Sequence, residues 1–487
     1  MINAFFQAEF LRFFHNPPTT DQFFAFQQIN DFVFDSDIMS AFILKGYAGT
    51  GKTSLVAAVV NALDSLNIKC LMLAPTGRAA KVLSAYARRP AFTIHKAIYR
   101  QKNYNSRPDF DLGFNTMRNV LFVVDEASMV SGLPNESSLN ESLLEGLMSF
   151  VYGRGSGCRI MFIGDDAQLP PVGEADSPAL RADIIRQFGI KVYEAQLNSV
   201  VRQEEMSGIL YNATVVREQL ANVQPLALPH ILFDGFDDIF NIPGNNLIET
   251  LTECYQKDGI DETMVVCRSN KLANIYNNGI RNQILWRESE LETGDYVMVA
   301  KNNYYWTDKL KAEKAAESKA AQQPLNQEDG AGMDFVANGD IAVVERVRNQ
   351  RELYGFKFAD CILRFPDYED FELEATVLLD ALQSEAPALT SEQNDRLYNK
   401  VMEDYMDIPQ KSERIKKLRQ DPYFNALQLK YAYAVTCHKA QGGQWTNIFV
   451  EQGYVPEDTS VVEYDRWLYT AITRATGKLY LVNWKNR

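Results

Sequence analysis

The chain has 487 residues, of which 46% are hydrophobic and 11% aromatic, and its formal net charge is −14. This length predicts two to four domains with ample apolar material for their cores. No apolar run reaches the roughly 18 residues of a membrane span, and the N-terminal segment lacks the basic region of a secretory signal, so we expect no membrane partner. The acidic balance argues only weakly against nucleic acid, because a locally basic or amide-lined channel can exist on an acidic protein. Six scattered cysteines without a Cys-x-x-Cys pair disfavour a zinc site and suit the reducing cytoplasm.

The first segment of the chain is rich in phenylalanine. Its pattern predicts a helix that carries Phe5, Phe6, Phe10, Phe13 and Phe14 as a stripe. We expect this stripe to pack onto the first domain, and a helix that docks a protein partner is the alternative.

A glycine-rich octapeptide, GYAGTGKT, runs from Gly46 to Thr53 and fits the P-loop pattern G-x-x-x-x-G-K-[ST]. An apolar strand, 41–44, precedes it, and a helical pattern, 54–66, follows it. Glycines let backbone N–H groups turn around a polyphosphate, and the helix N-terminus adds partial positive charge. The pattern therefore predicts ATP and Mg²⁺ as cofactors, with Lys52 on the β- and γ-phosphates and the Thr53 hydroxyl on the metal. The predicted nucleotide-binding residues of this loop are Gly46, Ala48, Gly49, Thr50, Gly51, Lys52, Thr53 and Ser54.

Two later strands end in polar residues that suit the same chemistry. The apolar strand 120–124 runs into Asp125 and Glu126. Asp125 is expected to hold Mg²⁺ through water, and Glu126 to orient or deprotonate the attacking water. The strand 160–163 delivers Asp165 and Gln168 to the same sheet edge, where the neutral Gln168 amide can sense the γ-phosphate.

Apolar runs alternate with helical stretches through most of the chain, which predicts parallel sheets covered by helices. The first set of strands is 41–44, 70–73, 120–124, 160–163 and 192–193. The second set is 264–267, 431–435, 448–450 and 479–482, with helices near 272–285 and 461–475. The sequence thus predicts an α/β fold with two such domains.

A long segment, 288–430, interrupts the second domain and differs in character. Short strands are expected at 294–299, 338–344, 362–365 and 371–377, which together favour a small β-barrel. Residues 309–333 read as a solvated helix followed by a flexible loop, and 378–427 is charged and helical in pattern. We expect 378–427 to project from the barrel away from any nucleic-acid channel, as a brace between domains or a docking site for a basic partner. A solvated insertion is the alternative.

In their order along the chain, these motifs resemble those of superfamily 1B DNA helicases, the group of RecD-like and Dda-like enzymes. The resemblance extends from Thr19 to Trp484 and begins with Thr19-Thr20-Asp21-Gln22, which implies that Gln22 contacts adenine. It implies two RecA-like domains, 1–190 and 191–287 with 431–487, and an inserted SH3-like barrel domain, 288–430.

The same resemblance implies a DNA path and two arginines. Pro75 to Ala80 is similar to motif Ia, Thr93-Ile94-His95 to motif Ib, and Thr436 to Gly442 to motif V. Leu197 to Gln203 is similar to motif IV, so Arg202 would approach the γ-phosphate, and Tyr469 to Ala475 to motif VI, so Arg474 would be the arginine finger. Ala440 and Gly443 depart from the family's motif V, where hydroxyl residues are usual. The DNA-binding residues that the resemblance implies are Thr76, Arg78, Thr93, His95, Asn302, Asn303, Thr436 and His438.

Two of these assignments leave alternatives open. Asn302 and Asn303 precede a cluster of aromatic residues and could contact DNA, but packing at the barrel edge explains them equally well. The polar segment 99–119 could form a short pin that splits the duplex, or a simple basic loop.

The sequence therefore predicts a monomeric ATP-dependent helicase that moves 5′→3′ on single-stranded DNA and acts at single/double-strand junctions in repair, recombination or replication. The predicted catalytic residues are Lys52, Glu126, Gln168, Arg202 and Arg474. The alternatives are an RNA-directed superfamily 1 helicase and a P-loop switch or scaffold that never translocates.

Overall fold

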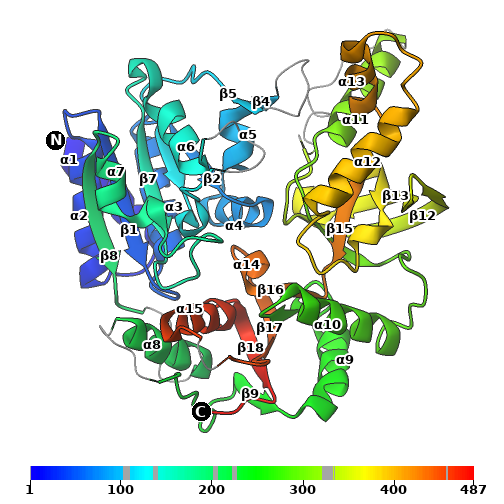
Figure 1. Cartoon of the computed structure of the whole chain (residues 1–487). Helices are drawn as coiled ribbons and strands as arrows, with labels where there is room; N and C mark the ends of the chain where they lie inside the picture. Colours follow the sequence, from blue (N-terminus) through cyan, green and yellow to red (C-terminus); the bar gives the residue numbers. More distant parts are fainter. Residues whose placement is uncertain are drawn as a thin grey trace. The chain divides into compact units, whose positions relative to one another are not determined.

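The computed structural model describes residues 2–101, 110–134, 141–200, 207–221, 227–320, 333, 335–456 and 459–486. Contacts divide the chain into two compact units (Figure 1). The first comprises Met1–Gln101, Asp109–Leu247 and Ala440–Arg487, and the second contains Ile248–Lys439. All six cysteines are free. Within the described ranges, no helix combines the length and the apolar character that crossing a bilayer demands.

The first unit contains a six-stranded, all-parallel sheet in the order β3-β2-β6-β7-β1-β8. Its strands are β1 Ser40–Gly46, β2 Cys70–Ala74, β3 Ala91–Thr93, β6 Leu121–Val124, β7 Arg159–Gly164 and β8 Lys191–Leu197. The helices of this part are α1 Ile2–Phe13, α2 Thr20–Val33, α3 Lys52–Ser65, α4 Gly77–Ala87, α5 Ile94–Ile98, α6 Leu143–Tyr152 and α7 Ala182–Arg186. All five strands expected here are present, and β3 was not predicted.

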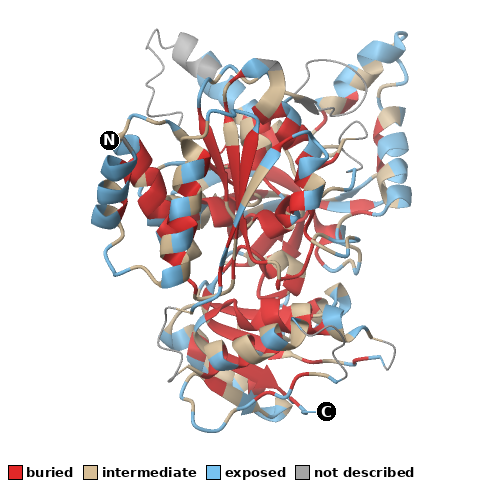
Figure 2. Cartoon of the chain, turned by 90° about the vertical axis from the view of Figure 1, so that its left-hand side faces the viewer, coloured by how far each residue is buried: buried red, intermediate tan, exposed pale blue. Residues whose placement is uncertain are grey.

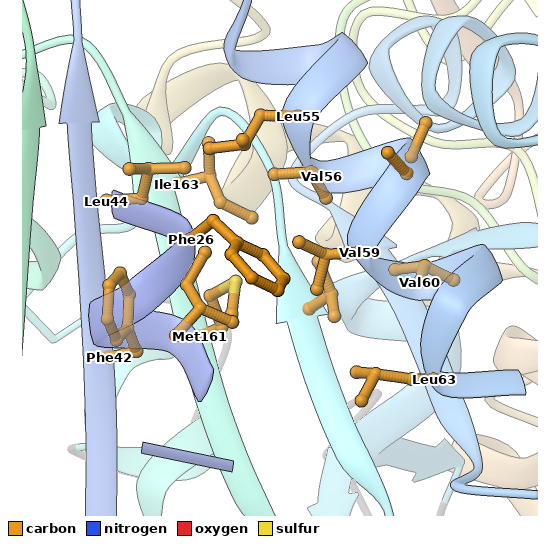
Figure 3. Close-up of a cluster of buried hydrophobic side chains, with 14 of the residues drawn as sticks. Phe26, Phe42, Leu44, Leu55, Val56, Val59, Val60, Leu63, Met161 and Ile163 are labelled. Carbon is orange, nitrogen blue, oxygen red and sulfur yellow. The ribbon is translucent and has the colours of Figure 1, made fainter. Parts of the chain in front are cut away.

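Alternate residues of each strand enter different cores, because successive side chains of a strand point to opposite faces. Phe42 and Leu44 of β1 belong to one buried cluster with α1, α2 and α3, whereas Ala41 and Ile43 belong to a second with α5 and α6. Figure 3 shows the first cluster, in which Phe26 lies among Leu55, Val59 and Met161. In Figure 2 the sheet strands are buried while the outer faces of the helices are exposed.

The N-terminal helix packs onto this domain as expected. Phe6 and Phe10 are fully buried, and the Phe10 ring stacks on Phe26 with centroids 4.0 Å apart. The predicted stripe is wrong at Phe5, which is 48% exposed because it lies outside the buried face that Phe6 and Phe10 form.

The first unit also holds a hairpin and a second group of parallel strands. β4 Tyr99–Gln101 pairs antiparallel with β5 Phe110–Leu112 inside the predicted pin-like insert, whose residues 102–109 lie outside the described residues. The second group is β9 Ile239–Ile242, β17 Trp445–Glu451 and β18 Ala475–Val482, with helices α8 Gly208–Leu220 and α15 Val461–Ile472. α15 ends at Ile472, three residues before the predicted end, because β18 begins at Ala475.

The second unit contains a parallel strand pair and a closed barrel. β10 Thr263–Cys267 pairs with β16 Ala434–Thr436, and the barrel order is β11-β12-β13-β14-β15. The barrel strands are β11 Tyr296–Val299, β12 Ile341–Leu353, β13 Phe356–Phe365, β14 Phe371–Leu378 and β15 Leu427–Tyr431. The helices are α9 Leu247–Lys257, α10 Asn270–Gln283, α11 Tyr305–Ala320, α12 Ser391–Glu403, α13 Lys411–Arg419 and α14 Cys437–Ala440. The parallel sheets and the small barrel confirm the predicted fold class.

The single strand predicted at 431–435 is wrong, because the structure divides it between two sheets. Tyr431 ends the barrel strand β15, and Ala434 begins β16. The Asn277 side chain stabilises this break: its Oδ1 accepts from the backbone N–H groups of Tyr433 and Ala434, at 3.1 and 2.8 Å.

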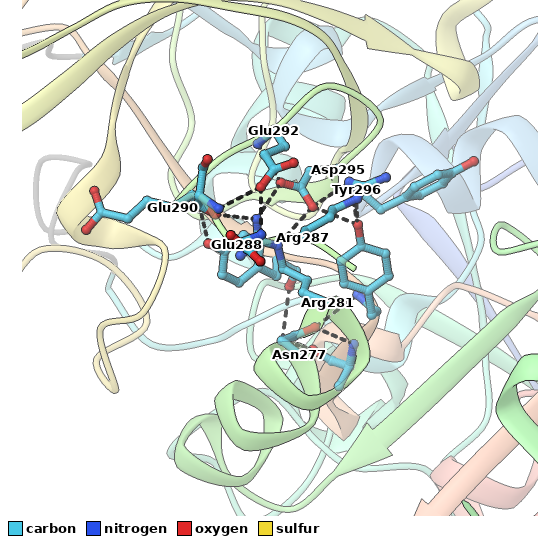
Figure 4. A network of polar contacts seen from close by, with 12 residues as sticks. Asn277, Arg281, Arg287, Glu288, Glu290, Glu292, Asp295 and Tyr296 are labelled. Carbon is cyan, nitrogen blue, oxygen red and sulfur yellow. Dashed lines mark hydrogen bonds and ion pairs between the residues drawn. The ribbon is translucent and has the colours of Figure 1, made fainter. Parts of the chain in front are cut away.

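A buried polar cluster lies at the root of the barrel (Figure 4). The carboxylate of Asp295, fully buried, accepts from Arg281 Nε and Nη2 at 3.0 Å each and from Arg287 Nη1 at 2.6 Å. Tyr433 Oη and the Glu292 backbone N–H donate to it as well, at 2.9 and 2.8 Å. We call these residues, with Asn277, the barrel-root cluster.

Candidate active site

The P-loop connects β1 to α3 and takes a conformation that requires glycine. Gly49 and Gly51 have φ of +77° and +79°, in the left-handed region that other residues rarely adopt. A Cβ on Gly46 would come within 2.9 Å of both Lys52 Cγ and Thr50 Oγ1. Lys52 Nζ donates to the carbonyls of Gly46 and Tyr47, at 2.6 and 2.9 Å. The lysine ammonium thus lies over the loop, where phosphate oxygens can replace the carbonyl partners.

Gln22 adjoins the P-loop through its side chain. It is 1% exposed, and its Nε2 donates to the Thr50 carbonyl at 2.9 Å. Its Oε1 accepts from Thr19 N at 2.9 Å as part of the capping box that begins α2. The predicted adenine reader is therefore beside the loop, with both ends of its amide occupied by protein partners.

Two carboxylates meet at the carboxyl edge of the sheet, because β6, β7 and β1 are neighbours in parallel order. Asp125 follows β6 and Asp165 follows β7, and Asp165 Oδ2 lies 4.0 Å from Lys52 Nζ. Burial, with the nearby charge of Glu126, raises the pKa of Asp125 to about 7, and burial raises the pKa of Asp165. Raised carboxyl pKa values of this kind are typical of functional sites, including those that bind a cation or an ionic ligand.

The next two predicted residues are held in unusual environments. Glu126 has φ +50°, a conformation that costs energy for a non-glycine residue. Gln168 is 4% exposed, and its Oε1 is a buried acceptor with no hydrogen-bond partner among the described residues. An unsatisfied buried acceptor of this kind costs about 1–3 kcal/mol. A donor such as an ordered water or a ligand hydroxyl would relieve that cost. We call Lys52, Asp125, Glu126, Asp165 and Gln168 the P-loop cluster.

Helix α15 contacts this cluster through Tyr469 and the loop beside it through Thr470. Tyr469 Oη donates to Asp165 Oδ2 at 2.7 Å and accepts from the Ala48 backbone N–H at 2.9 Å. Thr470 Oγ1 accepts from Leu169 N at 2.8 Å, and Gln441 Nε2 donates to the Leu169 carbonyl at 2.7 Å. These side chains were not among the predicted site residues. The only signal for Tyr469 and Thr470 was their place in the segment that resembles motif VI.

Of the two predicted arginines, the structure describes only Arg474. Arg474 is 3% exposed, and its guanidinium donates to the carbonyls of Thr470 and Gly443 and to Thr473 Oγ1, at 3.0, 3.3 and 3.2 Å. Its role as an arginine finger stays a prediction. Arg202 lies outside the described residues.

Of the predicted DNA-binding residues in the first unit, two begin helices. Thr76 and Thr93 are the N-caps of α4 and α5, and their hydroxyls accept from Ala79 N and Lys96 N. Arg78 stacks on the Trp445 ring at 4.2 Å and donates to the Gln444 carbonyl at 2.9 Å.

His95 belongs to the same predicted set. Burial lowers its pKa to about 4, so its imidazole is neutral near pH 7. A neutral imidazole can offer hydrogen bonds to DNA but no charge to phosphate.

The second unit holds the other four predicted DNA-binding residues. Asn302 Oδ1 accepts from Asn338 N at 2.6 Å, and Asn303 Nδ2 donates to the Asn425 carbonyl at 2.9 Å. These bonds stabilise the loop between β11 and α11. Thr436 ends β16 and His438 lies in α14. A DNA role for all four stays a prediction.

The chain matches two protein-family models. Residues 33–222 match an AAA domain, and residues 431–482 match the UvrD-like helicase C-terminal domain. The ATP-dependent RecD2 DNA helicase of Deinococcus radiodurans is 31% identical over 144 residues, which are 28% of this chain and 17% of that protein. The ATP-dependent DNA helicase dda of Enterobacteria phage T4 is 25% identical over 264 residues, or 53% of this chain and 55% of dda. A crystal structure of Pif1 helicase from Bacteroides in complex with ADP-AlF3 and ssDNA is 14% identical with a TM-score of 0.47, and the match covers 97% of this chain and 94% of that one.

The fold and the site define a P-loop nucleotide-binding protein with a UvrD-like C-terminal segment. The order of the helicase-like motifs along the chain resembles that of superfamily 1B helicases.

Proposed function

We propose that this protein is an ATP-dependent DNA helicase that translocates on single-stranded DNA and unwinds duplexes. The observation that carries the proposal is the P-loop cluster. It brings a P-loop lysine, two carboxylates and an unsatisfied buried amide together at one sheet edge. An open acceptor beside a P-loop lysine and two carboxylates supports a hydrolytic site.

Hydrolysis transfers a phosphoryl group to water, so the residues chiefly position groups and stabilise charge. Lys52 exchanges its carbonyl partners for phosphate oxygens, and Glu126 orients the attacking water and accepts its proton. The neutral Gln168 amide senses the γ-phosphate. Gln22, beside the loop, would contact adenine in place of a present protein partner.

The residues present also fit a magnesium ion, which we include in the proposal. Thr53 ends the P-loop in the first turn of α3, and Asp125 follows β6 at the same edge of the sheet, so a hydroxyl and a carboxylate are available as hard oxygen ligands. When bound, the ion would neutralise charge on the phosphates. It would also lower the pKa of Asp125, which burial holds near 7.

The test of the ATP site uses two variants. Lys52→Ala should weaken nucleotide binding because a phosphate loses its cation. Glu126→Gln should bind ATP normally but hydrolyse it at least about 100-fold more slowly, because it loses the group that activates water. Equal ATP affinity in wild type and Lys52→Ala would contradict the site.

The substrate is tested by measuring ATPase rate with no oligonucleotide, with single-stranded DNA and with RNA. A DNA translocase should be stimulated many-fold by DNA. Preferential stimulation by RNA would favour an RNA-directed helicase, and no stimulation by either would favour a P-loop switch or scaffold.

We further propose 5′→3′ movement, to be tested with duplexes that carry one single-stranded tail. Opening should require a 5′ tail, and efficient opening from a 3′ tail alone would contradict this direction. Melting one base-pair step costs about 1.4 kcal/mol of stacking, which one ATP per small step can supply.

Several finer expectations belong to the same proposal. The protein is expected to be a monomer in the cytoplasm that acts in DNA repair, recombination or replication. Its expected domains are 1–190, 191–287 together with 431–487, and 288–430. The segment 378–427 is expected to lie off the DNA path. α12 and α13 of that segment pack through Leu397, Val401 and Leu418 onto barrel residues such as Phe358. This packing supports attachment of the segment to the barrel, and its role as a brace between domains or as a docking site for a basic partner stays a proposal. Replacing 378–427 by a Gly/Ser linker should leave affinity for single-stranded DNA and its salt dependence intact.

A further inference from the structure

The hydroxyl of Tyr469 accepts a hydrogen bond from a backbone amide of the P-loop. Ala48 is the third residue of the glycine-rich loop, and its N–H points to Tyr469 Oη at 2.9 Å. The same hydroxyl gives its own proton to Asp165 Oδ2, 4.0 Å from the P-loop lysine. One buried oxygen therefore joins the phosphate-binding loop to the carboxylate at the end of β7.

The environment fixes the direction of these hydrogen bonds. Tyr469 is 1% exposed, and burial together with Asp165 raises its pKa well above the usual value, so it stays protonated. A protonated hydroxyl has one proton to donate, which goes to Asp165, and it accepts from the amide. The pair of bonds is thus fully determined, and it is lost as a unit when the hydroxyl is removed.

The helix that carries Tyr469 contacts the nucleotide site at successive positions. Thr470 bonds Leu169, the residue after Gln168, and Arg466 bonds Asp176 at 3.0 Å further along the same loop. Arg474 is the second residue after the end of α15. A change at the P-loop that moves Tyr469 therefore moves a rigid element that bonds Leu169, the residue after the predicted γ-phosphate sensor.

We propose that Tyr469 is a positioning residue that couples nucleotide occupancy of the P-loop to helix α15. This inference rests on the proposed function. The hydroxyl links loop and helix as long as no phosphate group of a nucleotide takes the Ala48 amide. Phosphate oxygens compete for the Ala48 amide, and release of the link lets α15 shift. Tyr469 itself touches no reacting atom.

Tyr469→Phe tests this directly, because it removes the hydroxyl and retains the ring. The matched control is Tyr464→Phe on the same helix: Tyr464 is also 1% exposed, and its hydroxyl accepts from Gln452 Nε2 at 2.8 Å. Each full-length variant is measured for equilibrium binding of a fluorescent ADP, for ATP turnover with saturating single-stranded DNA, and for thermal unfolding.

We expect Tyr469→Phe to lower DNA-stimulated kcat by about tenfold, the value of roughly one lost hydrogen bond. Its affinity for ADP should be unchanged or a few-fold tighter, because the Ala48 amide is freed for phosphate. Tyr464→Phe should leave both values near wild type. A kcat equal to that of the control would overturn the inference. So would weaker ADP binding with normal kcat, or a loss of folding that the control does not share. If the wild type itself binds no nucleotide or shows no stimulation by DNA, the proposed function fails instead.

Discussion

The barrel-root cluster and the P-loop cluster are both buried and polar, but they differ in how completely their groups are paired. Both carboxylate oxygens of Asp295 accept from arginine, and a tyrosine and a backbone amide add to them. In the P-loop cluster, Gln168 Oε1 has no partner within the described part of the chain, and burial raises the pKa values of Asp125 and Asp165. A saturated network stabilises one geometry, whereas an unsaturated one retains capacity for a ligand.

Breaking the saturated cluster should have the largest effect. Asp295→Ala leaves Arg281 and Arg287 buried without their carboxylate, which should lower the free energy of unfolding by about 3–5 kcal/mol. Chemical denaturation measures this. The control is Asp360→Ala on the same barrel, whose carboxylate pairs with Arg351 but is 27% exposed, and which should cost at most about 1 kcal/mol. Equal losses of unfolding free energy in the two variants would show that Asp295 contributes no more to stability than the partly exposed Asp360.

A substitution of Arg474 tests whether this buried arginine acts in catalysis or only stabilises the fold. If it stabilises transition-state charge, Arg474→Ala should lower turnover by about 10³-fold with little change in ATP affinity. Steady-state kinetics with single-stranded DNA and nucleotide titration separate the two quantities. Near-normal turnover with a lower unfolding temperature would make Arg474 a structural residue, as its present partners alone would suggest.

Two buried amides sharpen the comparison. Gln168→Ala removes an unsatisfied acceptor, so it should lower turnover about tenfold and leave the stability within about 0.5 kcal/mol. Asn277→Ala removes an amide that bonds Tyr433 and Ala434, so it should cost about 1–3 kcal/mol. Denaturation of both variants is the measurement, and a greater loss of stability in Gln168→Ala would reverse the distinction.

The smallest effect is expected for a substitution of Asp465 on α15, which should change how stability depends on pH. It is fully buried, both its carboxylate oxygens are unpartnered among the described residues, and burial raises its pKa to about 7. The folded chain then retains a proton that the unfolded chain loses near pH 4, so stability falls as pH rises through 7. Between pH 6 and 8, wild type should lose about 1 kcal/mol more than Asp465→Asn. Glu463→Gln, exposed on the same helix, should behave like wild type.

Linear motifs made much of this molecule predictable. Strands with continuous apolar runs, such as 41–44 and 120–124, were found because burial on both faces leaves a simple pattern. The short strands Ala91–Thr93 and Ile239–Ile242 were missed because they have no such run. The break between β15 and β16 was missed because the Asn277 side chain, distant in sequence, determines it.

Part of the candidate site could likewise be predicted from the sequence, and part could not. The P-loop and the residues after β6 and β7 follow from local sequence, because backbone geometry and spacing place them. The role of Tyr469 does not, since it depends on a contact with Ala48 that spans 421 positions in sequence. Spacing within a motif cannot reveal which loop its side chains will touch.

The order of strands in the barrel also bears on how the protein is made. β15, which closes the barrel by pairing with β11 and β14, is separated from β14 by α12 and α13. During synthesis, β11 to β14 leave the ribosome first, with two strand edges open until Leu427–Tyr431 follows. Open edges invite pairing with other chains. A nascent chain stalled within α12 or α13 is therefore the species that a chaperone most needs to protect.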